Sequence, residues 1–165
     1  MSTAGLAHEL VDRYAPDIDI PPPAVLDQVR RNAQLRASLL QEFGAVSAEE
    51  LADLVGSRAV RRRTVVDNWS RADRLVAVHW RGQTLVPGFQ LLSDGHPDPA
   101  LQPVLAALRQ YGAEPWERAL WWALPAPRLD GDRPVDLLMS SRTWQDRGDA
   151  QAALLAAAQR QREWF

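Results

Sequence analysis

The order of hydrophobic and polar positions first predicts a long helix in the segment 24–43. Its apolar positions recur at spacings of three and four, at Leu26, Val29, Ala33, Ala37 and Leu40. Such spacing gives an amphipathic helix one apolar face, and Gly44 is a typical residue just past a helix end. The face either packs on the core of the same chain or serves self-association. Upstream, Pro21-Pro22-Pro23 cannot continue a helix, so residues 1–23 are expected to form an arm with a stiff extended end.

Two shorter helices are predicted next. Ser47 and Glu50 have the spacing of a capping box, in which each side chain binds the other residue's backbone amide, and this favours a helix over 48–55. Gly56-Ser57 reads as a tight turn, and a second helix is expected over 58–72 with apolar residues on one side and arginines on another. The pair has the pattern of a helix-turn-helix.

A β-hairpin is predicted directly afterwards. Two β-prone runs, 75–80 and 83–87, flank Arg81-Gly82, where glycine supplies the positive φ of a two-residue turn. Pairing residue 80 with 83 sets 78 opposite 85 and 76 opposite 87. The residues that then share one face, and are expected to pack on the preceding helices, are Val76, Val78 and Leu85. Together these elements predict a winged helix-turn-helix-like module with a small hairpin.

Turn-forming residues at 93–99 mark an expected boundary, and the pattern beyond them is helical. Apolar residues at helical spacing precede Gly112, while Pro115 and Pro134 suit helix starts. An alanine-rich helix is expected over about 149–162. The chain is therefore predicted to be mainly α, with an N-terminal arm, a winged helix-turn-helix-like module over 24–92 and an all-helical domain over 93–165.

The composition excludes several kinds of site and of protein. The chain has 165 residues, 46% of them hydrophobic and none of them cysteine. It shows no run of about 20 apolar residues and no signal-peptide pattern, so a cytoplasmic protein without a membrane span is expected. The histidines, at 8, 79 and 96, have no metal-ligand spacing. Asp130, Asp132 and Asp136 lack an accompanying nucleophile, base or phosphate loop, so neither an enzyme nor a cofactor is predicted.

The placement of charge is more informative than the net charge of -2. All basic residues are arginine, and residues 54–81 hold seven arginines against two aspartates. Arginine forks fit phosphates and guanine edges, so this concentration predicts contact with operator DNA. The predicted DNA-binding residues are Arg58, Arg61, Arg62, Arg63 and Arg81. The alternative is a solvated helix face, and the near-neutral chain would need to oligomerise to bind DNA well.

A family resemblance appears in the second half. The segment 121–138, Trp-Trp-Ala-Leu-Pro-Ala-Pro-Arg-Leu-Asp-Gly-Asp-Arg-Pro-Val-Asp-Leu-Leu, resembles the signature of the Xre/MbcA/ParS toxin-binding domain, although Ala126 stands where that family often has asparagine. The resemblance covers about 93–165. A looser similarity to the DNA-binding half of some members rests on Trp69, Gly82, Pro87, Gly88, Phe89 and Gln90.

This resemblance implies that the chain is the antitoxin of a bacterial type II toxin-antitoxin system. Its partner would be a RES-domain toxin, an enzyme that degrades NAD, and the complex would be a hetero-oligomer. The predicted toxin-binding residues are Trp122, Arg128, Leu129, Asp130, Arg133, Arg160, Arg162, Trp164 and Phe165. The last residues, 160–165, are expected to occlude the toxin active site, or else to fold back on the helices or mediate self-association.

A different class of function stays open. The chain is alternatively a stand-alone winged-helix transcriptional regulator, in which the C-terminal helices sense a ligand or form a dimer. Co-purification separates the two hypotheses, because an antitoxin brings down an enzyme whereas a sensor brings down a small molecule or nothing.

Overall fold

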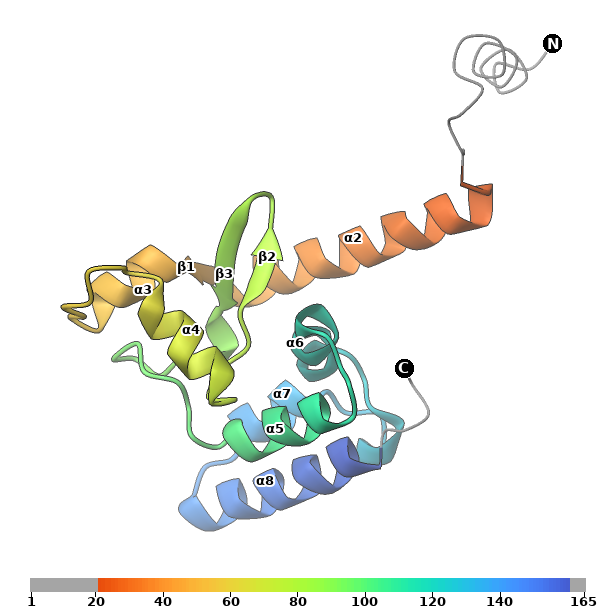
Figure 1. Cartoon of the computed structure of the whole chain (residues 1–165). Coiled ribbons are helices and arrows are strands. Elements are labelled where there is room, and N and C mark those ends of the chain that lie inside the picture. The colour runs from red at the N-terminus through yellow and green to blue at the C-terminus, as the bar shows by residue number, and fades with distance from the viewer. Residues whose placement is uncertain (1–20, 161–165) are drawn as a thin grey trace, which may run out of the picture. The chain divides into compact units, whose positions relative to one another are not determined.

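A computed structural model describes residues 21–160 and confirms a mainly helical chain with one small antiparallel sheet (Figure 1). The helices are α2 Pro23–Phe43, α3 Ala48–Leu54, α4 Thr64–Arg71, α5 Gln102–Gln110, α6 Pro115–Ala123, α7 Pro134–Met139 and α8 Trp144–Gln159. The strands are β1 Ala45–Ser47, β2 Val78–Trp80 and β3 Gln83–Pro87, and 3-10 turns cover Gly88–Gln90 and Pro127–Leu129. Residues up to Gln34 form one unit and residues from Leu35 onward another.

The hairpin has the predicted register. Trp80 pairs with Gln83 and Val78 with Leu85, and the turn residues Arg81 and Gly82 have φ of 48° and 82°. Two successive positive φ values define the turn that suits a two-residue hairpin. The sequence did not indicate β1, which pairs antiparallel with β3 and gives the sheet order β1-β3-β2. Two short helices and a hairpin follow the first helix in the predicted order, with β1 added before them.

The predicted pair between residues 76 and 87 does not form, and the proline explains why. Pro87 has no N–H with which to bind the carbonyl of Val76. The fully buried side chain of Gln90 takes this role: its Oε1 accepts from the Val76 N–H at 2.6 Å, and its Nε2 donates to the Val76 carbonyl at 2.9 Å. The Gln90 amide thus stands in for the missing backbone partner.

The two faces of the sheet pack on opposite groups of helices. Successive strand residues point to opposite sides. Val86 of β3 and Leu75, which lies just before β2, join a cluster with α3 and α4, the buried members of which also include Ala48, Leu51 and Val66. Val76 and Val78, with the half-buried Leu85, instead belong to the larger cluster that contains α5 to α8. The three residues were expected to pack on the preceding helices, and they share this cluster with Leu39 of α2 but not with α3 or α4.

The start of the second helix also differs from the prediction. The capping box at Ser47 and Glu50 is present, and the backbone amide of Ser47 lowers the pKa of the Glu50 carboxyl. After Gly56, however, the chain runs as a loop to Arg63, and α4 begins only at Thr64. Arginines three and four positions apart repel each other in a helix, and the apolar repeat that α4 buries, around Val66, begins only beyond them.

The second half is helical, as expected, and its larger cluster takes buried residues from both sides of the predicted boundary at 93. Helices α6 and α7 begin at Pro115 and Pro134, the two prolines predicted to start helices. Helix α8 begins five residues before its predicted start, because Thr143 and Asp146 form a further capping box. The division into domains at 23 and 92 stays a prediction.

Polar contacts fix the C-terminal end of α4 against α5 and α6. Asp73 accepts from Arg109 at 3.2 Å and from the buried Arg118 at 3.3 Å, where burial lowers the pKa of the Arg118 guanidinium. Arg109 also donates to the carbonyl of Arg71 at 3.2 Å, and Gln102 donates to that of Ala72 at 3.0 Å. These donors satisfy carbonyls that the end of a helix leaves free.

We expect Gln90→Ala to lower the free energy of unfolding by about 3 kcal/mol, because it leaves the buried N–H and carbonyl of Val76 without partners. Urea denaturation measures the effect. Gln83→Ala, at an exposed position of β3, is the control and should change stability by no more than about 0.5 kcal/mol. Equal losses in the two variants would show that the Gln90 amide adds nothing specific.

We expect Asp73→Asn to lower the free energy of unfolding by about 3 kcal/mol, because it leaves the Arg118 charge buried without a counter-ion. Asparagine tolerates the left-handed backbone at this position, where φ is 54°. Asp53→Asn breaks the exposed pair with Arg62 and should cost under about 1 kcal/mol. Chemical denaturation at neutral pH compares the stabilities of the two variants. An Asp73→Asn variant as stable as the wild type would contradict the proposed role of the buried ion pair.

Candidate nucleic-acid interface

The loop between α3 and α4 presents two arginines without ionic partners. Arg58 and Arg61 are exposed and form no ion pair within residues 21–160. The loop is shaped at its start by Ser57, the hydroxyl of which accepts from the Ala59 N–H at 3.2 Å. Val60, between the two arginines, is fully exposed, so no apolar contact of this side chain holds the loop away from a polyanion.

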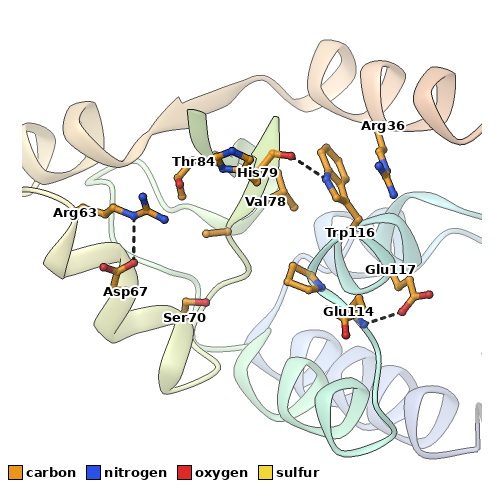
Figure 2. Close-up of a pocket in the computed structure, with 12 residues that line it drawn as sticks. Arg36, Arg63, Asp67, Ser70, Val78, His79, Thr84, Glu114, Trp116 and Glu117 are labelled. Carbon is orange, nitrogen blue, oxygen red and sulfur yellow. Dashed lines mark hydrogen bonds and ion pairs between the residues drawn. The ribbon is translucent and has the colours of Figure 1, made fainter. Parts of the chain in front are cut away.

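The neighbouring arginines are already paired. Arg62 binds Asp53 of α3, and Arg63 lies 3.5 Å from Asp67 of α4 (Figure 2). All four side chains are about half exposed, and exposed pairs of this kind exchange partners at little cost. The predicted group of four arginines thus lies on a loop rather than on the second helix, and only half of it is ionically free.

Helix α4 carries an outward polar stripe that sequence reasoning missed. Thr64, Asn68 and Arg71 recur at spacings of four and three, which places them on one face. Asn68 and Arg71 are exposed, and Arg71 donates to the Asn68 Oδ1 at 3.0 Å. Asparagine and arginine are the side chains that read adenine and guanine in the major groove. The sequence contains this stripe as polar residues that recur with the helical period of 3.6 residues, on the side opposite Val66 and Trp69.

The hairpin contributes one further cation. Arg81 occupies the exposed turn between β2 and β3, and its guanidinium lies 5.6 Å from the centre of the Trp80 ring. The Trp80 ring in turn meets the Trp116 ring edge-on at 5.7 Å. The tip of the hairpin therefore holds an arginine on an aromatic support. Arg81 lies where the prediction placed it, on the turn.

The loop 124–134, predicted to contact a toxin, has a defined backbone. The N–H groups of Leu129 and Gly131 both donate to the carbonyl of Ala126, and the Asp132 N–H donates to that of Leu129. Asp130 and Gly131 have φ of 55° and 88°. Leu129, one of the predicted toxin contacts, is half-buried and packs against the larger cluster, so it anchors the loop. Among the predicted contact residues of this loop, Arg128 and Asp130 are exposed and accessible to a partner.

Arg133 has partners within the chain. Its guanidinium binds Asp136 at 2.6 Å and Glu42 at 2.8 Å. These hydrogen bonds raise the pKa of Arg133 above its ordinary value, and the same contact lowers the pKa of Asp136. The side chain joins the start of α7 to the last turn of α2, which is a structural role. Contact with a toxin would have to compete with both carboxylates.

Trp122 was predicted to contact a toxin, and its position in the structure contradicts that prediction. It is fully buried, its ring meets that of Trp121 edge-on at 5.2 Å, and it presents no surface to a partner. The physical reason is that α6 packs against α5, α7 and β2 and so has little free surface. Arg160 is exposed just past α8, whereas Arg162, Trp164 and Phe165 lie outside the described residues.

The described residues hold little that points to other kinds of site. No helix within 21–160 is long and apolar enough to cross a membrane. In the same range, no three histidine, aspartate or glutamate side chains gather as metal ligands would.

In α2, Val29 and Leu26 of the predicted stripe are exposed, whereas Leu40 packs on the larger cluster. Self-association through the exposed positions stays a prediction.

Comparison with known proteins gives one likeness, and it concerns the fold. No protein-family model and no curated protein matches the chain. Among solved structures, the chain is similar to the NMR structure of Rv2175c, with a TM-score of 0.51 and 26% sequence identity. The match covers 68% of this chain and 80% of that one. The arrangement of helices around a small sheet is therefore one that a solved protein shares.

Proposed function

We propose that the protein binds double-stranded DNA through α4, the loop before it and the hairpin tip. The observation that carries the proposal is the free pair Arg58 and Arg61 on the exposed loop that leads into α4. Within this surface, the loop arginines bind phosphates and the polar stripe of α4 enters the major groove. The protein is then a transcriptional regulator, which was the alternative hypothesis from the sequence.

The two parts of this surface make separate contributions. Phosphate contacts by Arg58 and Arg61 supply salt-dependent affinity without sequence preference. Asn68 and Arg71 can each hydrogen-bond a base edge in two places, provided that they exchange their mutual bond for bonds to the bases. Affinity and specificity should accordingly respond to different substitutions.

We expect the double variant Arg58→Ala/Arg61→Ala to bind DNA about tenfold more weakly and to lower the slope of log affinity against log salt by about 2, one for each lost phosphate contact. Fluorescence anisotropy with a duplex selected from a randomised library measures both quantities. Asn68→Ala should instead cost about 1–3 kcal/mol on the selected duplex and little on random DNA.

The matched control is Arg128→Ala/Arg160→Ala, which removes two exposed arginines of the helical half. It loses the same charge and should keep the wild-type affinity and salt slope. If the control weakens binding as much as the loop variant does, the effect is one of net charge alone. If neither loop nor α4 substitutions change binding, the proposed surface is wrong.

Inhibition of a RES-type toxin is a second candidate function. It rests on the resemblance of 121–138 to the Xre/MbcA/ParS signature, and one observation favours it: the hydrogen-bonded loop 124–134 holds Arg128 and Asp130 exposed on a fixed backbone. A preordered loop loses little entropy on binding, which suits a partner interface. In this function, Arg128, Asp130 and Arg160 are the exposed residues of the described range that contact the toxin. The segment 160–165 blocks the toxin active site.

We expect a complex with a RES-domain enzyme encoded beside this chain to be weakened at least tenfold by Arg128→Glu, because the reversed charge meets the same toxin surface. Arg58→Glu, which makes the same change on the DNA-binding loop, should leave the complex intact. Co-purification and NAD consumption by the toxin provide the measurements. Absence of any complex would exclude the antitoxin function while leaving DNA binding untouched.

A further inference from the structure

A cavity of about 610 Å³ lies among α4, the hairpin and the start of α6 (Figure 2). Cavities of this size hold small organic molecules. Its lining combines apolar surface from Val78, Pro115 and Trp116 with charged side chains from several elements. The cavity therefore joins the elements proposed to bind DNA to the helical half of the chain.

The acidic groups of the cavity already have partners. Asp67 lies 3.5 Å from Arg63. Glu114 and Glu117 form a capping box at the start of α6, in which the Glu117 Oε2 accepts from the Glu114 N–H at 2.7 Å and the Glu114 side chain accepts from the amide of Glu117. These contacts hold the three carboxylates in local structure without removing their charge, so an anionic group has to lie at the opposite wall, away from them.

The basic group at the opposite wall is not satisfied. Arg36 has a buried Nε without a hydrogen-bond partner, and within the described residues its guanidinium forms no ion pair. The guanidinium lies 5.2 Å from the centre of the Trp116 ring. That ring is itself held, because its Nε1 donates to the carbonyl of His79 at 3.1 Å. The guanidinium thus carries a positive charge without an acidic partner among the described residues, and the cavity favours an occupant that supplies acceptor oxygens to it.

We propose that this cavity binds a small organic anion, a carboxylate or phosphate carried on an apolar body. The anionic oxygens bind the Arg36 guanidinium, which matches such groups in two places. The apolar body lies against Trp116, Pro115 and Val78. Neutral molecules of the same shape give the Arg36 guanidinium no anionic acceptor and bind more weakly.

Occupancy of the cavity is coupled to DNA binding, and this part rests on the proposed function. Arg63 just before α4, Ser70 of α4 and Thr84 of β3 line one side, whereas Glu114 just before α6 and Trp116 of α6 line the other. A ligand that contacts both sides favours one spacing of α4 and the hairpin relative to α6. It therefore changes the affinity of the same elements for DNA.

The test uses the ¹⁵N-labelled full chain without DNA, and it follows the Trp116 indole N–H signal, assigned with Trp116→Phe. Sodium benzoate and phenyl phosphate are the probes, with benzamide and inorganic phosphate as matched ligands that lack the charge or the apolar body. We expect saturable shifts of the Trp116 signal with the first two only. Equal binding of benzamide, or equal binding of inorganic phosphate, would overturn the proposal without any variant being needed.

The variant arm compares Arg36→Gln with Arg30→Gln, an exposed arginine on the same helix. We expect Arg36→Gln to weaken benzoate binding at least tenfold and Arg30→Gln to leave it unchanged. Undiminished binding by Arg36→Gln would place the ligand elsewhere. A final titration measures DNA affinity at saturating benzoate, with a change of threefold or more expected. An unchanged affinity would refute the coupling, whereas absence of DNA binding in every condition would refute only the proposed function.

Discussion

The burial of both faces of one three-stranded sheet is the constraint on which the rest of this fold depends. On one face Val86 completes the small cluster under α3 and α4, and on the other Val78 belongs to the cluster of the helical half; Leu75 and Val76, just before β2, join these two clusters in turn. Neither group of helices has a complete core without the strand residues. The sheet therefore lies between the elements proposed to bind DNA and the helices α5 to α8, and both groups pack on it.

Local chemistry explains which features could be predicted from the sequence. The hairpin register depends on Arg81-Gly82 alone, and the capping box on Ser47 and Glu50, so both were foreseen. The side on which each of the residues 75–78 packs was not foreseen, because all four are apolar without alternation. Strand β1 escaped notice because three residues carry too little periodicity, and only its partner β3 makes it a strand.

The candidate site shows the same limit. The arginines at 58–63 marked a basic region correctly, but their helical placement depended on continuing the apolar repeat of α4 backward past Thr64. The polar stripe on α4 is visible in the sequence, but the prediction considered only the arginines beside it. The cavity could not be foreseen, since Arg36, His79 and Trp116 come together only through tertiary packing.

The hydrogen bonds at the end of α4 affect how deletion experiments should be interpreted. An eight-residue helix is far too short to persist by its own backbone bonds, and here Gln102 and Arg109 satisfy carbonyls at its C-terminal end. A fragment that stops at residue 92 keeps every residue of the proposed DNA surface yet loses both donors and half of the sheet's covering. Failure of such a fragment to bind DNA would reflect fraying of α4, and it would not map a DNA contact to the segment that was removed.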